Sequence, residues 1–375
     1  SNGIWMSANS NIQTFTNTGS IQASGSGIRM AGGTISTFDN QGLIKTNSTA
    51  GHGIYITGEV NIQTLKNTGT IQGATQDGDG IRIKGSNVTI NQIDNSGLIE
   101  SADEAIGIKD WAWNNRLKVD TIKNSGTLKG TIIGIVGLNA DIDLIENSGT
   151  IITGKYNVTD GGSGAIQLHS SSVGTIINSG YIKSASTYGI QLITANSSNT
   201  LKTLINTGTI EGKMDGLFIG QGTKTDYIEN TGVIKGENAG INVDFKSWNL
   251  KKSGTVGTIV NKGSGEIVGN NYGIIIPTSS ADYTVEAVKI ESGKVEGTNG
   301  AGIALGADQD ISTSIEISGE NTVVTGGQAG IVNEGNLGAD GKGGITISNG
   351  ATITSNSGNG SGIVNQGNGS ISGDI

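Results

Sequence analysis

The chain has 375 residues, of which 64 are glycine, one is proline and none is cysteine, and its formal net charge is −9. The lack of cysteine excludes a disulfide framework, a thiolate metal site and a cysteine nucleophile. An acidic chain without clustered Lys and Arg does not fit a nucleic-acid partner, and regularly spaced Ile, Leu and Val argue against disorder.

The N-terminal residues already belong to a repeat. The chain opens with "SNGIWM" (Ser1–Met6), which has the Gly-Ile pattern found later in every unit, and it has no signal peptide pattern. No run of 18 apolar residues occurs along it. We therefore interpret the sequence as a piece of a longer protein.

One pattern then returns along the chain. "NIQTFTNTGSIQA" (Asn11–Ala23) recurs as "NIQTLKNTGTIQG" (Asn61–Gly73) and as "LKTLINTGTIEG" (Leu201–Gly212). The glycine of its N-x-G motif and of later variants returns every 23 to 31 residues, from Gly19 to Gly350. A period in this range is typical of solenoids, and the unequal steps indicate coils joined by loops of unequal length.

Each unit contains three short segments: I-x-x-[LIF]-x-N, then G-x-[ILV], then G-[IL]-x-[ILVM]. Aliphatic residues at alternate positions, bounded by Gly, Asn and Ser, predict short strands, and no segment has the spacing of a helix. A propeller blade would need about 40–45 residues. The sequence therefore predicts an all-β fold, a right-handed parallel β-helix (solenoid) of about 13 coils with three strands each, as a single domain over residues 1–375.

The first segment ends at a corner of constant length. Seven residues separate its first aliphatic residue from the N-x-G glycine in ten consecutive units, so a turn of fixed geometry is expected, with Asn and Gly supplying left-handed backbone. The stacked asparagines should form a ladder of amides through residues 1–267: Asn17, Asn40, Asn67, Asn95, Asn124, Asn147, Asn178, Asn206, Asn230 and Asn261. Glu291, Ile317 and Ser348 follow in that position, so residues 268–375 should be less regular.

Two long loops hold three of the four tryptophans, "KDWAWNNRLK" (Lys109–Lys118) and "DFKSWNLKKS" (Asp244–Ser253). Both follow the third segment and should leave the same edge of the helix. Loops on a rigid scaffold often carry function, and Trp and Arg dominate binding hot spots. The candidate partner-binding residues are Trp111, Trp113, Arg116, Phe245, Lys246, Trp248, Lys251 and Lys252. The alternative is that the aromatic side chains fold back as local clasps that cover a seam of the helix.

Other residues offer little for catalysis or metal binding. The predicted outward column of the third segment contains no carboxylate: Trp5, Arg29, Tyr55, Arg82, Lys109, Val136, Gln167, Gln191, Phe218, Asn242, Ile275, Ala304 and Val332. His52 and His169 lack partners at metal spacing and are expected on the surface. "DGDG" (Asp77–Gly80) lacks the twelve-residue series of a calcium loop. We predict no catalytic residues, no metal site and no cofactor.

The repeated N-[ST]-G-x-I-x-G … G-I-x-I units, as in Asn67–Ile83 and Asn230–Val243, resemble the passenger domains of type V autotransporters. Among these, fusobacterial outer-membrane autotransporter adhesins are the most similar. The resemblance implies a right-handed β-helix exported through a C-terminal β-barrel translocator that is not part of this sequence. It also implies a bacterial cell-surface location, anchored in the outer membrane or released.

These observations together predict an adhesin that is not an enzyme. Its partners would be a host-cell surface protein, a glycan or other bacteria, and we expect a monomer. Two alternatives stay open: a toxin-like passenger that acts on membranes, and a β-helical enzyme that degrades polysaccharide.

Overall fold

A computed structural model describes residues 1–85, 87–110, 116–154, 163–194, 198–244, 253–276, 283–306, 310–338, 343–367 and 369–372. The chain divides into two compact units, Ser1–Ser186 and Thr187–Ile375. The described residues form strands and turns without a helix, and none of them forms a helix that could cross a membrane. The expectation of one domain over 1–375 stays a prediction.

The first unit is built from short strands. They are β1 (Ile4–Met6), β2 (Asn11–Asn17), β3 (Ser20–Ala23), β4 (Ile28–Asn40), β5 (Leu43–Thr46), β6 (Ile54–Asn67), β7 (Thr70–Gln72), β8 (Ile81–Ile83), β9 (Asn87–Asn95), β10 (Leu98–Ser101), β11 (Glu104–Lys109), β12 (Leu117–Asn124), β13 (Thr127–Gly130), β14 (Ile133–Leu138), β15 (Ala140–Asn147), β16 (Thr150–Thr153), β17 (Gly164–His169), β18 (Ser172–Asn178) and β19 (Tyr181–Ser184).

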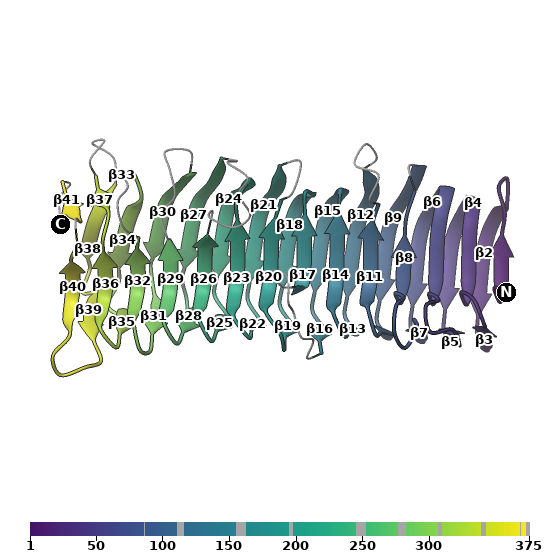
Figure 1. Cartoon of the computed structure of the whole chain (residues 1–375), viewed down its shortest axis with the longest axis horizontal. Coiled ribbons are helices and arrows are strands. Elements are labelled where there is room, and N and C mark those ends of the chain that lie inside the picture. Colours follow the sequence, from purple (N-terminus) through teal and green to yellow (C-terminus); the bar gives the residue numbers. More distant parts are fainter. Residues whose placement is uncertain are drawn as a thin grey trace. The chain divides into compact units, whose positions relative to one another are not determined.

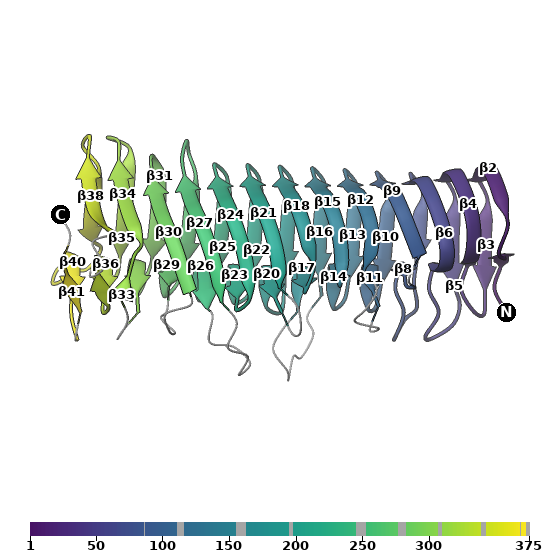
Figure 2. The same cartoon turned by 90° about the horizontal axis from the view of Figure 1, so that it is seen from above.

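These strands stack as three parallel ladders, one for each predicted segment. Figure 1 shows β8, β11, β14 and β17 side by side, and Figure 2 shows β9, β12, β15 and β18 in the same order. The third ladder runs β3, β5, β7, β10, β13, β16, β19. Each strand pairs with the equivalent strand of the next coil, which is the arrangement of a parallel β-helix.

The second unit repeats this architecture. Its strands are β20 (Tyr188–Ile193), β21 (Asn199–Asn206), β22 (Thr209–Gly212), β23 (Asp215–Gly220), β24 (Thr223–Asn230), β25 (Val233–Gly236), β26 (Ala239–Asp244), β27 (Gly254–Asn261), β28 (Glu266–Gly269), β29 (Tyr272–Ile276), β30 (Tyr283–Ile290), β31 (Gly293–Gly297), β32 (Ala301–Leu305), β33 (Asp310–Ile311), β34 (Ser314–Ser318), β35 (Thr322–Gly326), β36 (Ala329–Asn333), β37 (Asn336–Leu337), β38 (Gly344–Ser348), β39 (Thr352–Ser355), β40 (Ser361–Asn365) and β41 (Ser370–Ile371). A short parallel ladder, β33–β37–β41, is added near its C-terminal end.

The predicted fold class is confirmed: the described strands form about 11 turns of roughly three strands each, close to the predicted 13 coils. The core consists of aliphatic columns in register. In the third ladder of the first unit Ile44, Ile71 and Ile99 face one another and are fully buried. Each such side chain contributes roughly 1.5–3 kcal/mol through burial, and only while a neighbouring coil covers it on either side.

A column of buried amides lies inside the corner after the first-segment strands. In the first unit Asn67 Nδ2 donates to Asn95 Oδ1 at 2.7 Å and also to the carbonyl oxygens of Gly69 and Leu98. The equivalent amide-to-amide bonds join Asn17, Asn40, Asn67, Asn95, Asn124, Asn147 and Asn178 at 2.7–2.8 Å. In the second unit they join Asn206, Asn230 and Asn261. Each rung therefore satisfies backbone groups that the corner buries.

The glycine of N-x-G is needed for a different reason from the one expected. The asparagines of this column and the glycines of the N-x-G motifs, from Gly19 to Gly232, do not have positive φ. A Cβ atom at Gly97 would instead lie 2.1 Å from the carbonyl oxygen of Gly69 in the neighbouring coil, and Gly126 would meet Gly97 at 2.2 Å. The close approach of stacked backbones excludes a side chain here.

The amide column ends at Asn261, whose Nδ2 donates to the carbonyl oxygens of Gly265 and Ser292 instead. The register places Ile290, Ile317 and Ile347 in the next three coils. The expected occupants Glu291 and Ser348 were therefore misplaced by one residue. The later turns use glycines with positive φ, such as Gly263 and Gly293, so the corner changes its backbone geometry where the asparagines stop.

We predict that Gly97→Ala lowers the free energy of unfolding by at least about 2 kcal/mol, because its methyl group would overlap the Gly69 carbonyl oxygen. Gly19→Ala is the matched control, since a Cβ atom at Gly19 meets nothing within 4 Å. Thermal unfolding of the two variants followed by circular dichroism compares them. Equal melting temperatures would contradict the close-approach explanation.

Candidate functional site

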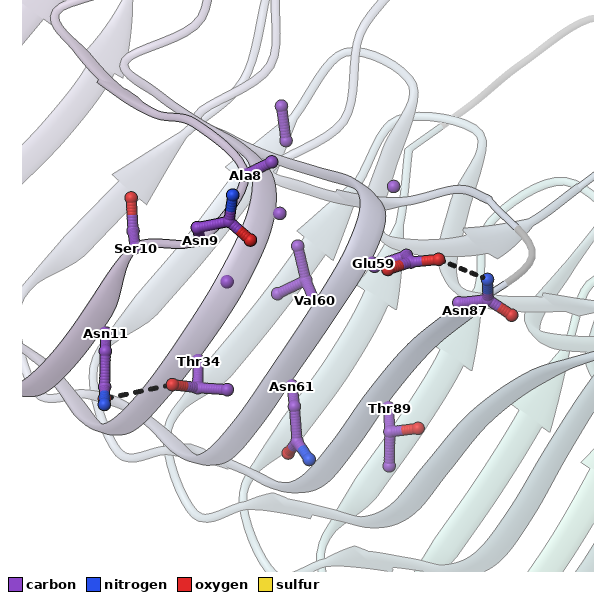
Figure 3. A pocket seen from close by; sticks show the side chains of 14 residues that line it. Ala8, Asn9, Ser10, Asn11, Thr34, Glu59, Val60, Asn61, Asn87 and Thr89 are labelled. Atoms are coloured by element: carbon purple, nitrogen blue, oxygen red, sulfur yellow. Dashed lines mark hydrogen bonds between the residues drawn. The ribbon is translucent and has the colours of Figure 1, made fainter.

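The first unit has a polar hollow of about 790 Å³ on its surface, where the third-segment strands turn into the first-segment strands. Figure 3 shows its side chains projecting from β2, β4, β6 and β9 and from the turn before β2. We name it the polar hollow; its lining residues are Ala8, Asn9, Ser10, Asn11, Ala31, Gly32, Gly33, Thr34, Gly58, Glu59, Val60, Asn61, Asn87 and Thr89.

Bare backbone forms the floor of the polar hollow. Gly33 and Gly58 have φ values of 103° and 78°, in the left-handed region that favours glycine. A Cβ atom at Gly33 would lie 2.3 Å from the carbonyl oxygen of Ser10, and one at Gly58 would lie 2.5 Å from that of Ala31. The close approach of the neighbouring coil therefore excludes a side chain at these two positions.

A row of neutral hydrogen-bonding side chains borders this floor. The register sets Asn11 beside Thr34, Thr34 beside Asn61 and Asn61 beside Thr89, one residue per coil. Thr34 Oγ1 donates to Asn11 Oδ1 at 3.1 Å, and Asn61 is exposed (Figure 3). The row presents amides and hydroxyls at the spacing of the coils, about 4.8 Å.

Glu59 is the one charged side chain among the described residues that line the polar hollow. Its Oε1 accepts a hydrogen bond of 3.2 Å from Asn87 Nδ2 of the next coil (Figure 3). The hollow therefore has acceptors and amide donors but lacks a cationic group in its described lining, which makes it suited to neutral polar ligands.

A second group of polar residues lies at the start of the third-segment strands and is here called the acidic cluster. It consists of Asp79, Asp103 and Glu104, whose ligand-type oxygen atoms lie within 4.8 Å of one another. The side chain of Asp79 is fully buried and that of Glu104 is 6% exposed. Arg82 Nη1 lies 3.1 Å from Asp79 Oδ2, and Lys109 Nζ forms ion pairs with Glu104 and Asp103.

Two carboxylate oxygens of the acidic cluster, Asp79 Oδ1 and Glu104 Oε2, are buried without a hydrogen-bond donor. Burial raises the pKa of Glu104 well above its ordinary range, and the neighbouring Asp79 carboxyl raises it further. Burial likewise raises the pKa of Asp103, with Asp79 adding to the effect. The three carboxylates outnumber the two cationic side chains by one, so one added proton brings the net charge of the cluster to zero. The Glu104 carboxyl is the group best placed to hold this proton.

The oxygen ligands of the acidic cluster are of the kind that calcium uses. Arg82 and Lys109, however, already neutralise one oxygen each, and a shared proton satisfies the two remaining buried oxygens. We therefore interpret the cluster as a proton-sharing carboxyl pair, and the absence of a metal site stays a prediction.

His52 belongs to the same network and is half-buried, not simply on the surface as expected. Its Nδ1 accepts a hydrogen bond of 2.9 Å from the backbone N–H of Asp79, and its ring lies 5.0 Å from that of Tyr55. Burial lowers the pKa of His52, while Asp79 opposes this effect. The bond to Nδ1 requires the neutral ring, with the proton on Nε2.

Sequence reasoning missed the acidic cluster because it misaligned one coil. The register places Gly107, not Lys109, beside Arg82. A Cβ atom at Gly107 would lie 2.4 Å from Asp79 Oδ2, so glycine leaves room for that carboxylate. Asp79 and Glu104 occupy the position before the strand glycine, and Ala105 replaces that glycine in the second case. Comparing this position in successive units would have brought the two acids together.

Most of the predicted partner-binding residues lie outside the described residues: Trp111, Trp113, Phe245, Lys246, Trp248, Lys251 and Lys252. Arg116 is described. Its Nε donates to Asp141 Oδ1 at 2.7 Å, and its Nη1 and Nη2 donate to the carbonyl oxygens of Ser170 and Ala140. Arg116 thus ties its coil to the two following coils, while both binding by the aromatic side chains and their folding back as clasps stay predictions.

Comparisons of the chain with family models, with curated proteins and with solved structures found no match.

We predict that the contribution of Glu104 to the stability of the protein falls as pH rises above about 4.3, the ordinary pKa of glutamate. Below that pH Glu104 is protonated in both states, and its contribution is fully present. As pH rises toward the raised pKa of the folded state, the unfolded chain ionises while the buried carboxyl does not, so stability is lost.

Glu104→Gln keeps a neutral donor toward Asp79 and should reduce the decline in melting temperature as pH rises above about 4.3. Glu59→Gln, which changes an exposed glutamate, is the control and should keep the decline of the unmodified chain. Parallel profiles for all three proteins would refute the shared proton. A lower melting temperature on adding EDTA would instead indicate a bound cation.

Proposed function

We propose that the chain is part of the passenger of a bacterial adhesin of the autotransporter type, and that the polar hollow binds a linear glycan. The β-helix is compatible with such a passenger and also with a protein that acts on polysaccharide. Two observations support the adhesin proposal. The repeats resemble those of autotransporter passengers, and the polar hollow has side chains that can pair with the hydroxyls of a glycan.

The row Asn11, Thr34, Asn61 and Thr89 is the observation that carries the proposal. A side chain that repeats once per coil can make the same contact repeatedly with a ligand that itself repeats along its length. Amides and hydroxyls can pair with sugar hydroxyls through both donors and acceptors. The bare floor at Gly33 and Gly58 lets such a polymer approach the backbone closely.

The charge of the site and of the chain narrows the ligand class further. A net charge of −9 and Glu59 at the polar hollow disfavour polyanions such as nucleic acid. A neutral glycan has no such penalty. The partners would then be glycans of a host-cell surface or of other bacteria, and the passenger would stand on the bacterial surface or be released from it.

The alternative of a polysaccharide-degrading enzyme needs two carboxylates that reach the substrate. Asp79 and Glu104 are a close pair, but their side chains are 0% and 6% exposed. The acidic cluster therefore does not support cleavage of a polymer at that place. The toxin-like alternative predicts assembly on lipid vesicles, which a sedimentation assay with the same fragment would detect.

We predict that the double variant Thr34→Ala/Asn61→Ala weakens binding to a glycan array by about 10- to 100-fold, because each lost hydrogen bond contributes roughly 1 kcal/mol. Gln63→Ala is the matched control, since Gln63 is exposed on the same strand, β6, but does not line the polar hollow. Glycan binding that survives in the double variant would place the site elsewhere. Release of shortened oligosaccharides would favour the enzyme alternative.

The tryptophan loops form a second proposed binding surface, which contacts protein receptors or glycans through aromatic side chains. We predict that replacing Trp111, Trp113 and Trp248 with alanine reduces attachment of the fragment to cells at least tenfold. Aromatic residues that anchor an interface typically contribute roughly 2 kcal/mol or more to the free energy of binding. Trp5→Ala is the control, because Trp5 is 68% exposed and belongs to neither loop. Unchanged attachment of a folded triple variant would leave the clasp interpretation.

A further inference from the structure

The second unit has a hollow of its own, of about 450 Å³, over the outer face of its third-segment strands. We name it the Ala304 hollow. Its lining residues are Asn271, Tyr272, Ile275, Asn299, Gly300, Ala301, Ala304, Leu305, Gly306, Gln328, Val332, Glu334 and Gln366. They come from β29, β32 and β36 and from the turns that flank these strands and β40.

A difference in side-chain size creates this hollow. Ile275, Ala304 and Val332 stand side by side on the outer faces of β29, β32 and β36. Because the alanine has only a methyl group, the larger side chains on either side project beyond it. The floor of the hollow is therefore an apolar depression one coil wide, with Ala304 itself only 8% exposed.

Polar side chains border the floor on both edges, and Glu334 is the one charged side chain among the described lining residues. Asn271, Asn299 and Gln328 each precede a third-segment strand and are exposed. On the opposite edge Glu334 follows β36 and Gln366 follows β40, and Gln366 Nε2 donates to Glu334 Oε1 at 2.7 Å. Since parallel strands begin at one edge and end at the other, the two polar rows face each other across the apolar floor.

The ring of Tyr272 adds an aromatic surface to the hollow. Tyr272 is the first residue of β29, is half-buried and pairs in register with Ala301 of β32. The aromatic ring and the aliphatic floor form an apolar contact surface. The carboxamides on one edge and the Glu334–Gln366 pair on the other supply hydrogen-bond donors and acceptors at its borders. The volume lies within the range of small-molecule sites.

We propose that the Ala304 hollow binds a single neutral pyranose residue. The C–H face of the sugar ring would pack on Ile275, Ala304 and Val332, and its hydroxyls would pair with the carboxamides and with Glu334. An apolar ligand would cover the rim amides and leave them unpaired, which costs free energy. An anion would meet Glu334 and no cationic group among the described lining residues.

This site is independent of the polar hollow. The residues of the Ala304 hollow belong to the second unit, whereas Thr34 and Asn61 belong to the first. The two proposed ligands also differ in size. The Ala304 hollow has room for one sugar ring, whereas the repeated side chains of the polar hollow suit a polymer. Failure of the glycan-array experiment therefore leaves this proposal unaffected, and the reverse is equally true.

The test uses saturation-transfer NMR on the whole 375-residue chain. The probes are the methyl pyranosides of galactose, glucose and N-acetylglucosamine, with sorbitol as a comparison that has similar hydroxyls but no ring face. We expect saturation transfer to at least one pyranoside at millimolar concentration and none to sorbitol. Transfer to no pyranoside, or equal transfer to sorbitol, would overturn the proposal.

Two variants locate the site. Ala304→Leu fills the depression from the outer face and should weaken pyranoside binding at least tenfold. Val364→Leu, in the same outward column beside Val332 but outside the lining, is the matched control and should change binding less than twofold. Gln328→Ala removes an exposed rim amide and should weaken binding severalfold without affecting folding. Equal binding by Ala304→Leu and Val364→Leu would overturn the assignment.

Discussion

The hydrogen bond between one buried asparagine amide and the next is the interaction on which each unit of this structure depends. It joins equivalent corners of neighbouring coils, and each amide also donates to backbone carbonyl groups of its own corner and of the next coil. The bond requires coils to stack in one register, because a shift of one residue would place an exposed side chain in the column. The bare glycine backbone beside it lets the coils approach closely enough for these bonds to form.

This constraint divides the residues of a coil into two classes. Residues that point inward repeat with little change, since each aliphatic side chain is covered by its counterparts in the coils on either side. Residues that point outward and those in the turns are free of this requirement, and all the candidate sites are made from them or from the corners. The polar hollow results from corners without side chains, and the Ala304 hollow results from one small residue in a column of larger ones. The acidic cluster likewise depends on Gly107, which leaves room for the Asp79 carboxylate.

Burial of charge in the acidic cluster is compatible with the fold because opposite charges and a proton are close by. Arg82 lies three residues after Asp79, and Lys109 lies on the same strand as Glu104, so the local chain supplies its own compensation. The cluster, His52 and Tyr55 link consecutive coils through polar contacts where the core elsewhere uses aliphatic ones. At the end of the amide column, after Asn261, apolar side chains replace polar ones, because Ile290 and Ile317 take the place of the asparagines. The turns at this corner then use glycines with positive φ.

The sequence alone determined the fold class, the three strands of each coil and the residues that stack in the corner, because periodic burial leaves a periodic pattern of aliphatic, Asn and Gly residues. It could not place residues where the period itself changes, as at Gly107 and after Asn261, since a register is decided by which strands pair. The hollows and the Asp79–Glu104 pair were decided only by the tertiary structure. They depend on distances between side chains 23 or more residues apart, and those distances follow from how coils of unequal length stack.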